Sequence, residues 1–463
     1  MPTDPAFLSA RDLLNHFRDH TLSPVEALEA VLQRLDADNP ALNAFHLVDI
    51  EMGRAMAQAS EARWMKNEPM GALDGVPVPI KDTNAAKGWP FRIGSKTTSP
   101  DPVDYDGPPV ARLREAGAVF FGKTTTPEFG WKGVTDSPLT GITRNPWDPV
   151  RTPGGSSGGA AVAVACGMAP IALGGDGGGS IRMPCGFTGV FGIKPTAGRV
   201  PNAPAPGVGT MTTPGPIARN VDDAALMLDV LAGAEWRDPT ALPPQDSDFL
   251  GRIEDGIKGL RIGFSANLGY AQVETEVAET VAGAVRLFEA CGAVVEEADP
   301  GFADPRWALD TIWRVAYATT LRHLTEAQRR ALDPDLARVA DSGRAISAVD
   351  YLHAFNERVR LGEAMQRYHQ RYDLMVTPAL PLTAFAAGIL VPDRSNYPEW
   401  WDWSPFTWPF NMTRQPAAVC PCGFSRDGLP IGLQIVGPLY RDDLVLRAAR
   451  AFETLRPFKM PRG

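Results

Sequence analysis

The segments Arg151-Thr-Pro-Gly-Gly-Ser-Ser-Gly-Gly159 and Leu173-Gly-Gly-Asp-Gly-Gly-Gly-Ser-Ile-Arg-Met-Pro184 form a glycine-rich and serine-rich block. From residue 154 to residue 192, 13 of 39 residues are glycine, against 45 of 463 in the whole chain. Because glycine loses much conformational freedom when it is ordered, this density predicts tight turns and close backbone approach. The uncharged run 152–175 is interrupted by glycine and proline, so we predict a loop, a core helix and a core strand rather than a membrane span.

The sequence on both sides of this block predicts helices that alternate with short apolar strands. Ser23-Pro-Val-Glu26 is a capping box with proline at the first helical position, and it opens a predicted helix that reaches about Leu35. The remaining clear signals are helices over 51–66, 110–116, 222–231 and 273–288, with strands over 76–80, 118–121 and 293–297. This alternation indicates an α/β layered fold.

Composition narrows the class of protein further. Hydrophobic residues make up 44% of the chain and charged residues 21%, which is ordinary for a soluble globular protein. The net charge of −9 argues against a nucleic-acid partner and favours a small-molecule substrate. The start of the chain has no basic patch followed by an apolar segment, so no signal peptide is expected. Five cysteines without zinc spacing indicate reduced thiols and a cytoplasmic protein: Cys166, Cys185, Cys291, Cys420 and Cys422.

Several well-known motifs are only partly matched by the glycine-rich block. Gly154-Gly-Ser-Ser-Gly158 fits the G-x-S-x-G nucleophile elbow, but the proline-rich lead-in 145–153 cannot be the central strand that this elbow requires. No Gly-Lys-Ser/Thr follows the glycines, which excludes a P-loop, and Ser180 stands where a dinucleotide fingerprint needs glycine. Only nine of the 45 basic residues are lysine, so Lys81 at the end of an apolar strand is conspicuous.

Taken together, the motifs resemble the amidase signature family. The resemblance covers roughly residues 8–240, which include the two opening segments, and residues 404–445. Residues 245–400 are not distinctive. The segments that carry it are Gly71-Ala-Leu-Asp-Gly-Val-Pro-Val-Pro-Ile-Lys-Asp82, Phe191-Gly-Ile-Lys-Pro-Thr196, Gly215-Pro-Ile-Ala-Arg219, Asn411-Met-Thr-Arg-Gln-Pro-Ala417 and Gly428-Leu-Pro-Ile-Gly-Leu-Gln-Ile-Val-Gly437. The resemblance implies one amidase domain over 1–463, with a large mixed central β-sheet covered by helices on both faces. Its expected parts are a helical N-terminal region (1–70), a signature core (71–240), a variable part (241–400) and a C-terminal return to the core (401–463).

The resemblance also assigns roles to individual residues. Ser180 is expected to be the nucleophile, Ser156 the cis-peptide serine that relays a proton, and Lys81 the base. A serine hydroxyl is a weak nucleophile until a neighbour takes its proton, and burial can lower the pKa of a lysine enough to make it that acceptor. The supporting residues implied in the same way are Ser157, Asp176 and Arg182, where Asp176 and Arg182 are expected to pair.

Three glycines and three aromatic residues complete the predicted site. Gly177, Gly178 and Gly179 are expected to form the oxyanion hole, because amides without side chains can converge on one oxygen, each worth about 3 kcal/mol. A short helix from Ser180 would add to that positive field. Aromatic residues that we expect to line the substrate pocket are Trp131, Trp403 and Phe406.

The sequence-based hypothesis is an amidohydrolase that cleaves an aryl or apolar acyl amide, with ester or carbamate side activity. It needs no metal and no organic cofactor, and a homodimer is one expected assembly. The alternative is the glutaminase subunit of a tRNA-dependent amidotransferase, but Met183 replaces its usual glutamine and Gly177 its usual threonine. A non-catalytic relative that serves as a binding module is the third hypothesis.

Overall fold

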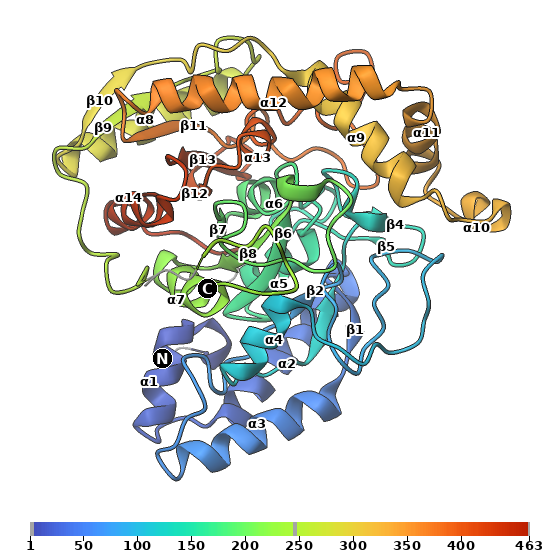
Figure 1. The fold of residues 1–463 in the computed structure, drawn as a ribbon. Helices are drawn as coiled ribbons and strands as arrows, with labels where there is room; N and C mark the ends of the chain where they lie inside the picture. Colours follow the sequence, from blue (N-terminus) through green and yellow to red (C-terminus); the bar gives the residue numbers. More distant parts are fainter. Residues whose placement is uncertain (1–3, 244–247, 462–463) are drawn as a thin grey trace.

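A single large mixed β-sheet organises the molecule. The computed structural model describes residues 4–243 and 248–461. Within them, eleven strands follow the order β1-β3-β2-β6-β8-β7-β12-β13-β11-β9-β10 (Figure 1). The strands are β1 Phe45–Val48, β2 Ile80–Lys81, β3 Gly122–Thr124, β6 Ile171–Asp176, β7 Phe191–Lys194, β8 Thr213–Ala218, β9 Arg261–Phe264, β10 Val294–Glu297, β11 Leu374–Pro378, β12 Ala417–Phe424 and β13 Pro430–Val436. Strands β4 (Asp136–Ser137) and β5 (Gly141–Ile142) form a separate small hairpin.

Helices cover both faces of this sheet, as predicted. Successive side chains of a strand point to opposite faces. In β6, Ile171 and Leu173 belong to a core shared with α4 (Pro108–Glu115), α7 (Val221–Leu231), α8 (Thr275–Ala290) and α14 (Asp442–Leu455). Ala172, between them, packs instead with α5 (Gly158–Ala165) and α6 (Arg182–Thr188).

The remaining helices are α1 Ala10–Arg18, α2 Pro24–Leu42, α3 Ile50–Trp64, α9 Arg306–Thr320, α10 Glu326–Arg330, α11 Pro334–Gly343, α12 Ala348–Tyr368 and α13 Pro409–Met412, with short 3-10 turns η1 Pro5–Phe7, η2 Glu128–Gly130 and η3 Gly209–Met211.

Most predicted helices are present, with shifted ends. The capping box at Ser23 is formed in both directions, and α2 begins at Pro24. The helix continues past the predicted end at Leu35 to Leu42, and Asn43 closes it in the left-handed conformation. The apolar period is no longer clear after Leu35, but Asp38 and Leu42 are both buried in this part of the helix. Packing against the rest of the protein therefore stabilises the last turns of α2.

Two strand predictions near the glycine-rich block are corrected. The predicted strand 76–80 is reduced to Ile80–Lys81, because prolines at 77 and 79 lack the N–H groups that a ladder needs, leaving a single bridge from Pro77 to Val119. The strand predicted over 118–121 lies later, at Gly122–Thr124. Strand β2, which ends at Lys81, pairs in parallel with β3 on one side and with β6 on the other.

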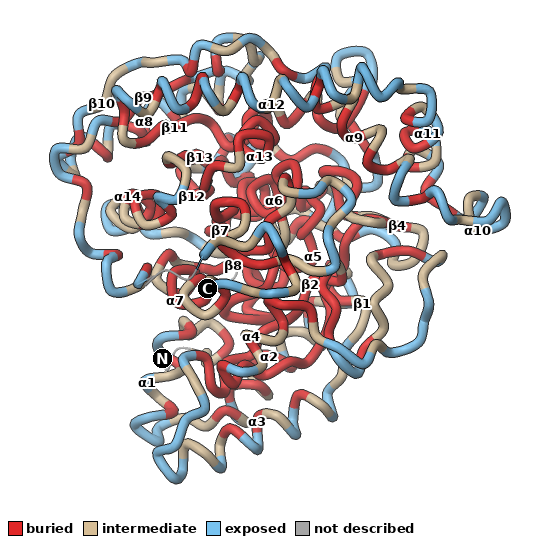
Figure 2. Tube along the Cα trace, in the orientation of Figure 1, coloured by how far each residue is buried: buried red, intermediate tan, exposed pale blue. Residues whose placement is uncertain are grey.

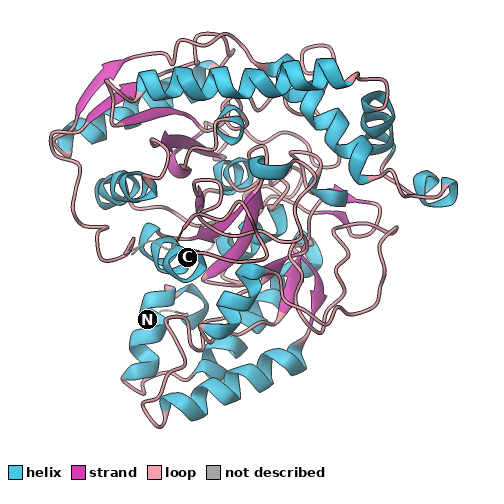
Figure 3. Ribbon diagram, in the orientation of Figure 1, coloured by secondary structure: helices cyan, strands magenta, loops and turns pink. Residues whose placement is uncertain are grey.

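A second, helical layer occupies one end of the molecule. The long helix α12 crosses it and packs on α9, which packs in turn on α11 (Figure 3). The outer side of α12 is exposed, while the elements around α5, α6 and β6 form the most deeply buried part of the chain (Figure 2). Within the described ranges, no helix combines the length and apolar character needed to cross a membrane.

Candidate active site

The three residues with predicted catalytic roles line one cavity of about 270 Å³. Lys81 ends β2, Ser156 lies in the loop before α5, and Ser180 lies in the turn between β6 and α6. The other side chains and backbone segments around the cavity come mostly from the loops after β2 and β7 and from helix α9. The central part of the sheet therefore presents these residues to one enclosed space.

Lys81 and Ser156 are in direct contact. Lys81 Nζ lies 2.8 Å from Ser156 Oγ and donates a second hydrogen bond of 3.2 Å to the carbonyl oxygen of Gly175. The peptide bond between Gly155 and Ser156 is cis. Burial lowers the pKa of Lys81 to about 7, against the opposing effect of the Asp176 carboxylate. At neutral pH this amine can therefore act as a proton acceptor.

The nearest carboxylate in the sequence does not neutralise Lys81. Asp82 forms an ion pair of 2.6 Å with Lys123, and both side chains are fully buried. His46 approaches the same carboxylate at 3.3 Å. Asp82 lies in the turn after β2 and is not among the residues that line the cavity with Lys81. Lys81 thus keeps its depressed pKa beside an acidic residue, and in the described ranges it has no ion-pair partner.

Ser180 lies in the turn that follows β6, and its side chain reaches the cavity. Helix α6 begins two residues later, at Arg182, rather than at Ser180 as predicted. The backbone carbonyl of Ser180 accepts a hydrogen bond of 3.0 Å from the amide of Ser157. Within residues 4–243 and 248–461, the Ser180 hydroxyl makes no hydrogen bond. It is therefore free to meet a molecule in the cavity.

Ser157 supports the site through the backbone of β6. Its hydroxyl donates a hydrogen bond of 3.1 Å to the Gly175 carbonyl and accepts one of 3.3 Å from the Gly175 amide. The same carbonyl accepts a hydrogen bond from Lys81. Ser157 thus positions the acceptor that orients the lysine.

The predicted oxyanion hole needs one correction. The Gly179 amide donates a hydrogen bond of 2.7 Å to the Asp176 carboxylate, so it is not available to a substrate. The amides of Gly177 and Gly178 make no hydrogen bond to the described part of the chain, and Gly177 lines the cavity. The turn therefore leaves Gly177 and Gly178 as the candidate donors, while Gly179 holds the turn closed.

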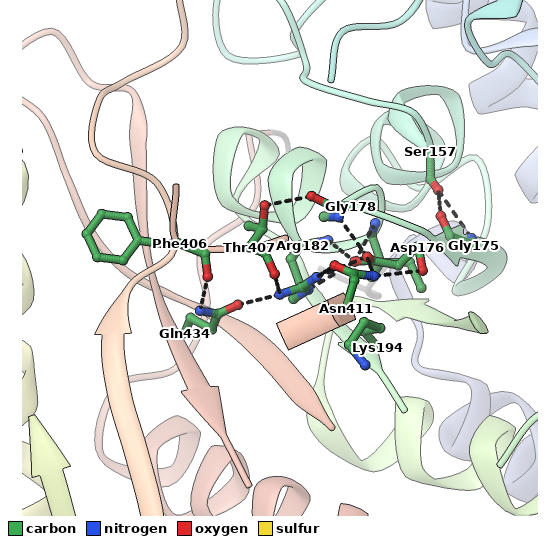
Figure 4. A network of polar contacts seen from close by, with 12 residues as sticks. Ser157, Gly175, Asp176, Gly178, Arg182, Lys194, Phe406, Thr407, Asn411 and Gln434 are labelled. Carbon is green, nitrogen blue, oxygen red and sulfur yellow. Dashed lines mark hydrogen bonds and ion pairs between the residues drawn. The ribbon is translucent and has the colours of Figure 1, made fainter. Parts of the chain in front are cut away.

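Asp176 and Arg182 pair as predicted, and they do so at the centre of a larger buried network (Figure 4). Both side chains are fully buried and make two hydrogen bonds of 3.0 Å to each other. Arg182 also donates to Asn411 at 2.5 Å and to Gln434 at 2.7 Å, and Asn411 donates to Asp176 at 2.8 Å. Arg182 further donates to the Thr407 carbonyl. This network fixes the turn that carries Ser180 to the C-terminal strands.

Asn411 and Gln434 are site residues that the sequence did not predict, although both lie in segments that resemble the amidase signature family. The available signal was the polar residue within an otherwise apolar run, Gly-Leu-Gln434-Ile-Val. A buried amide on a central strand needs hydrogen-bond partners, which predicts a polar network without naming its members.

Removing Arg182 is expected to destabilise the fold strongly. Arg182→Met leaves the fully buried Asp176 carboxylate without its cation, which typically costs about 3–5 kcal/mol of unfolding free energy. Urea denaturation followed by circular dichroism measures this loss. Arg330→Met, which removes one side of an exposed pair with Glu326, is the control and should leave the midpoint unchanged. Equal midpoints for Arg182→Met and the wild type would contradict the assignment.

The aromatic residues predicted for the pocket do not line this cavity. Trp403 is fully buried and stacks on Phe187, and Phe406 is fully buried in a separate hydrophobic cluster. Trp131 is fully buried and accepts a hydrogen bond from Trp313 at its carbonyl oxygen. The aromatic and aliphatic wall of the cavity consists instead of Phe91, Ile93, Phe129, Val208, Trp313 and Tyr317. This part of the prediction is wrong, because the variable region 241–400 supplies α9, whose contribution the sequence did not reveal.

The comparisons with known proteins agree with this fold. The "Amidase" family model matches residues 26–446. An acylamidase of Rhodococcus erythropolis is 37% identical over 98% of this chain and 96% of its own length. A glutamyl-tRNA(Gln) amidotransferase subunit of Carboxydothermus hydrogenoformans is 33% identical over 98% of this chain and 99% of its own length.

Solved structures of known proteins are also similar to the structure of this chain. A bacterial aryl acylamidase of the amidase signature family superposes with a TM-score of 0.90 at 31% identity, covering 97% of this chain and 96% of that one. A 6-aminohexanoate cyclic dimer hydrolase in complex with substrate gives 0.89 at 30% identity, covering 98% of each chain. The fold and site thus define an α/β enzyme that hydrolyses amides. The chain belongs to the amidase signature family.

Proposed function

We propose that this enzyme cleaves neutral amides with apolar or aromatic groups through an acyl-enzyme on Ser180. The observation that carries the proposal is the 2.8 Å contact between Lys81 and Ser156 at the wall of a cavity that Ser180 also lines. A depressed lysine pKa, a hydroxyl that can accept and donate, and an unbonded serine hydroxyl are the parts that acyl transfer requires.

The chemical steps follow from these parts. Ser180 makes no hydrogen bond to Ser156 in this structure, so its hydroxyl turns toward Ser156 when the substrate binds. Neutral Lys81 then accepts a proton from Ser156 as Ser156 takes the proton of Ser180, whose oxygen attacks the amide carbon. The carbonyl oxygen becomes negative and accepts hydrogen bonds from the amides of Gly177 and Gly178. When the tetrahedral intermediate collapses, the C–N bond breaks and the leaving nitrogen receives the proton back through Ser156. Water then attacks the acyl-enzyme with the same base, and the carboxylic acid and free Ser180 result.

The lining of the cavity supports a neutral substrate. Lys81 is the only charged residue among the described residues that line it. An ammonium group of a substrate would be buried there without a partner of opposite charge, which is costly. A carboxylate could pair only with protonated Lys81, which is the form that cannot act as the base. The wall around Trp313 and Phe129 instead offers aromatic and aliphatic surface. Esters and carbamates of similar shape present the same carbonyl to Ser180, so we include them as side activities.

The amidotransferase alternative has less support from this cavity. Free glutamine carries an α-ammonium and an α-carboxylate, and a glutaminase must bind both. In the described part of the chain, neither an aspartate, a glutamate nor an arginine lines the cavity. Together with Met183 and Gly177 in the signature segment, this argues for an enzyme that acts without an amidotransferase complex.

The substrate class can be tested on the purified chain alone. We expect kcat/KM for a neutral anilide such as acetanilide to exceed that for glutamine by at least about 100-fold, because a single unpaired buried charge typically costs several kcal/mol. Release of aniline and release of ammonia are the two measurements. N-acetyl-sulfanilate, an anilide with a negative ring substituent, is the matched control and should be a poor substrate. Glutamine hydrolysis that equals anilide hydrolysis would favour the alternative.

A further inference from the structure

The segment 128–132, which we call the docking segment, contacts both the catalytic cavity and the helical layer of α9, α11 and α12. Phe129 and Gly130 of this segment line the cavity. A Cβ atom placed on Gly130 would lie 3.4 Å from Ser156 Oγ, so this backbone passes close to the proposed proton relay. A shift of the docking segment would therefore change the surroundings of the catalytic residues.

Helix α9 is attached to the docking segment at two backbone carbonyls. Trp313 Nε1 donates a hydrogen bond of 3.0 Å to the carbonyl oxygen of Trp131. The Tyr317 hydroxyl donates one of 3.2 Å to the carbonyl oxygen of Phe129. Trp313 and Tyr317 also line the cavity. The same two side chains thus form part of the cavity wall and fasten α9 to the docking segment.

The start of α11 is attached to both ends of the docking segment through Asp333. The Asp333 amide donates a hydrogen bond of 2.7 Å to Glu128 Oε2, and the Asp333 carboxylate forms an ion pair of 2.7 Å with Lys132. Asp333 is also the N-cap of α11, because its side chain accepts a hydrogen bond of 2.9 Å from the Asp335 amide. The first and last residues of the docking segment therefore fix the position at which α11 begins.

Glu128 is buried at an energetic cost that its position explains. Its side chain is fully buried, and within residues 4–243 and 248–461 it forms no ion pair. The Ser95 hydroxyl donates a hydrogen bond of 2.6 Å to the second carboxylate oxygen. Burial raises the pKa of Glu128, although the bonds from the Asp333 amide and from Ser95 oppose the shift. Because a lost donor would leave a buried acceptor unsatisfied, the carboxylate holds both donors firmly in place.

We propose that Glu128 and Lys132 are positioning residues that dock the helical layer on the active site and thereby determine its affinity for the apolar part of the substrate. In the described part of the chain, neither side chain lines the cavity. They act instead through Asp333, α11 and α9, and so place the wall that Trp313 and Tyr317 form. The inference rests on the proposed function, because it takes an apolar substrate and Ser180 as the nucleophile.

Two sulfonyl fluorides of different size test this inference, since each forms a sulfonyl ester on Ser180 with loss of fluoride. Phenylmethanesulfonyl fluoride carries an aromatic ring toward the wall, whereas methanesulfonyl fluoride carries only a methyl group. In Glu128→Gln the second-order rate constant for the aromatic reagent should fall at least about tenfold, because a displacement of about 1 Å can cost about 10²-fold. The rate constant for the methyl reagent should stay within about twofold of the wild type, because the nucleophile and its base are unchanged.

A second variant and a matched control accompany Glu128→Gln. Asp333→Asn keeps the helix cap but not the charge that pairs with Lys132, so the aromatic rate constant should fall at least about threefold. Glu453 is also a buried glutamate that accepts a backbone amide at the start of a helix, that of Val221 in α7, and it does not line the cavity. Glu453→Gln should react as the wild type with both reagents.

Amide hydrogen exchange of peptides from α9 and α11, followed by mass spectrometry, measures the docking without any reaction at Ser180. Exchange should be faster in folded Glu128→Gln than in the wild type and unchanged in Glu453→Gln. The inference is overturned if folded Glu128→Gln and Asp333→Asn keep the wild-type ratio of the two rate constants, which includes the case in which both constants fall together. A wild type that neither reagent labels would contradict the proposed function, and unchanged exchange in Glu128→Gln would then overturn the docking.

Discussion

Ser180→Ala is expected to lower kcat for amide hydrolysis by at least about 10⁴-fold, to the limit of detection. The hydroxyl is the group that forms the covalent bond to the acyl carbon, and removing a nucleophile typically eliminates all catalysis except that from binding and the oxyanion hole. The fold should be unaffected, because the Ser180 hydroxyl makes no hydrogen bond in the described ranges. Initial rates with an anilide and covalent labelling by a fluorophosphonate probe measure the effect.

The control for this experiment is a serine elsewhere in the fold. Ser60 is buried in α3 and is not among the residues that line the cavity. Ser60→Ala should retain both labelling and turnover, whereas Ser180→Ala should retain neither. Labelling of Ser180→Ala at the wild-type level would assign the nucleophile to another residue and would remove the basis of the proposed function.

The parts of the fold that the sequence predicts well are those with local causes. The capping box at Ser23 determines where α2 starts, and the apolar period over 273–288 predicts α8 within two residues at each end. The end of α2 and the position of β3 depend on tertiary packing, which local patterns do not contain. Strand β2 shortens for a local reason that could have been used, namely the prolines at 77 and 79.

In the candidate site too, some residues could be predicted from the sequence and others depend on tertiary packing. Lys81, Ser156 and Ser180 could be selected because the signature segments are specific in residue type and spacing, and the fold brings them to one cavity. The cavity wall could not be predicted in this way. Trp313 reaches it from α9, in the region without distinctive motifs, and the aromatic segment 400–410 packs into the core instead. An aromatic side chain is equally suited to a core and to a pocket, so residue type alone does not distinguish the two.

Lys81 is expected to make catalysis depend on pH with a midpoint of about 7. The amine accepts a proton only when it is neutral, and it becomes neutral as the pH rises through its pKa. Burial lowers that pKa to about 7, although Asp176 opposes the shift. The active fraction should therefore rise from about one tenth at pH 6 to about nine tenths at pH 8, whereas an ordinary lysine with a pKa of about 10.4 would stay almost wholly protonated. Profiles of kcat/KM from pH 5 to 9 measure this dependence.

Two variants assign the midpoint to Lys81 rather than to another group. Lys194 is also buried, and its pKa is also lowered to about 7, but it does not line the cavity and donates to the Pro195 carbonyl. In folded Lys194→Met the midpoint should stay within about 0.5 pH unit of the wild type, because the base that titrates is unchanged. Lys81→Arg keeps a positive group that cannot lose its proton near neutrality, so kcat should fall by about 10²–10⁴-fold at every pH in the range. A flat wild-type profile, or a Lys81→Arg variant with the wild-type midpoint, would exclude this lysine as the base, because each result requires the proton of Ser180 to be accepted elsewhere.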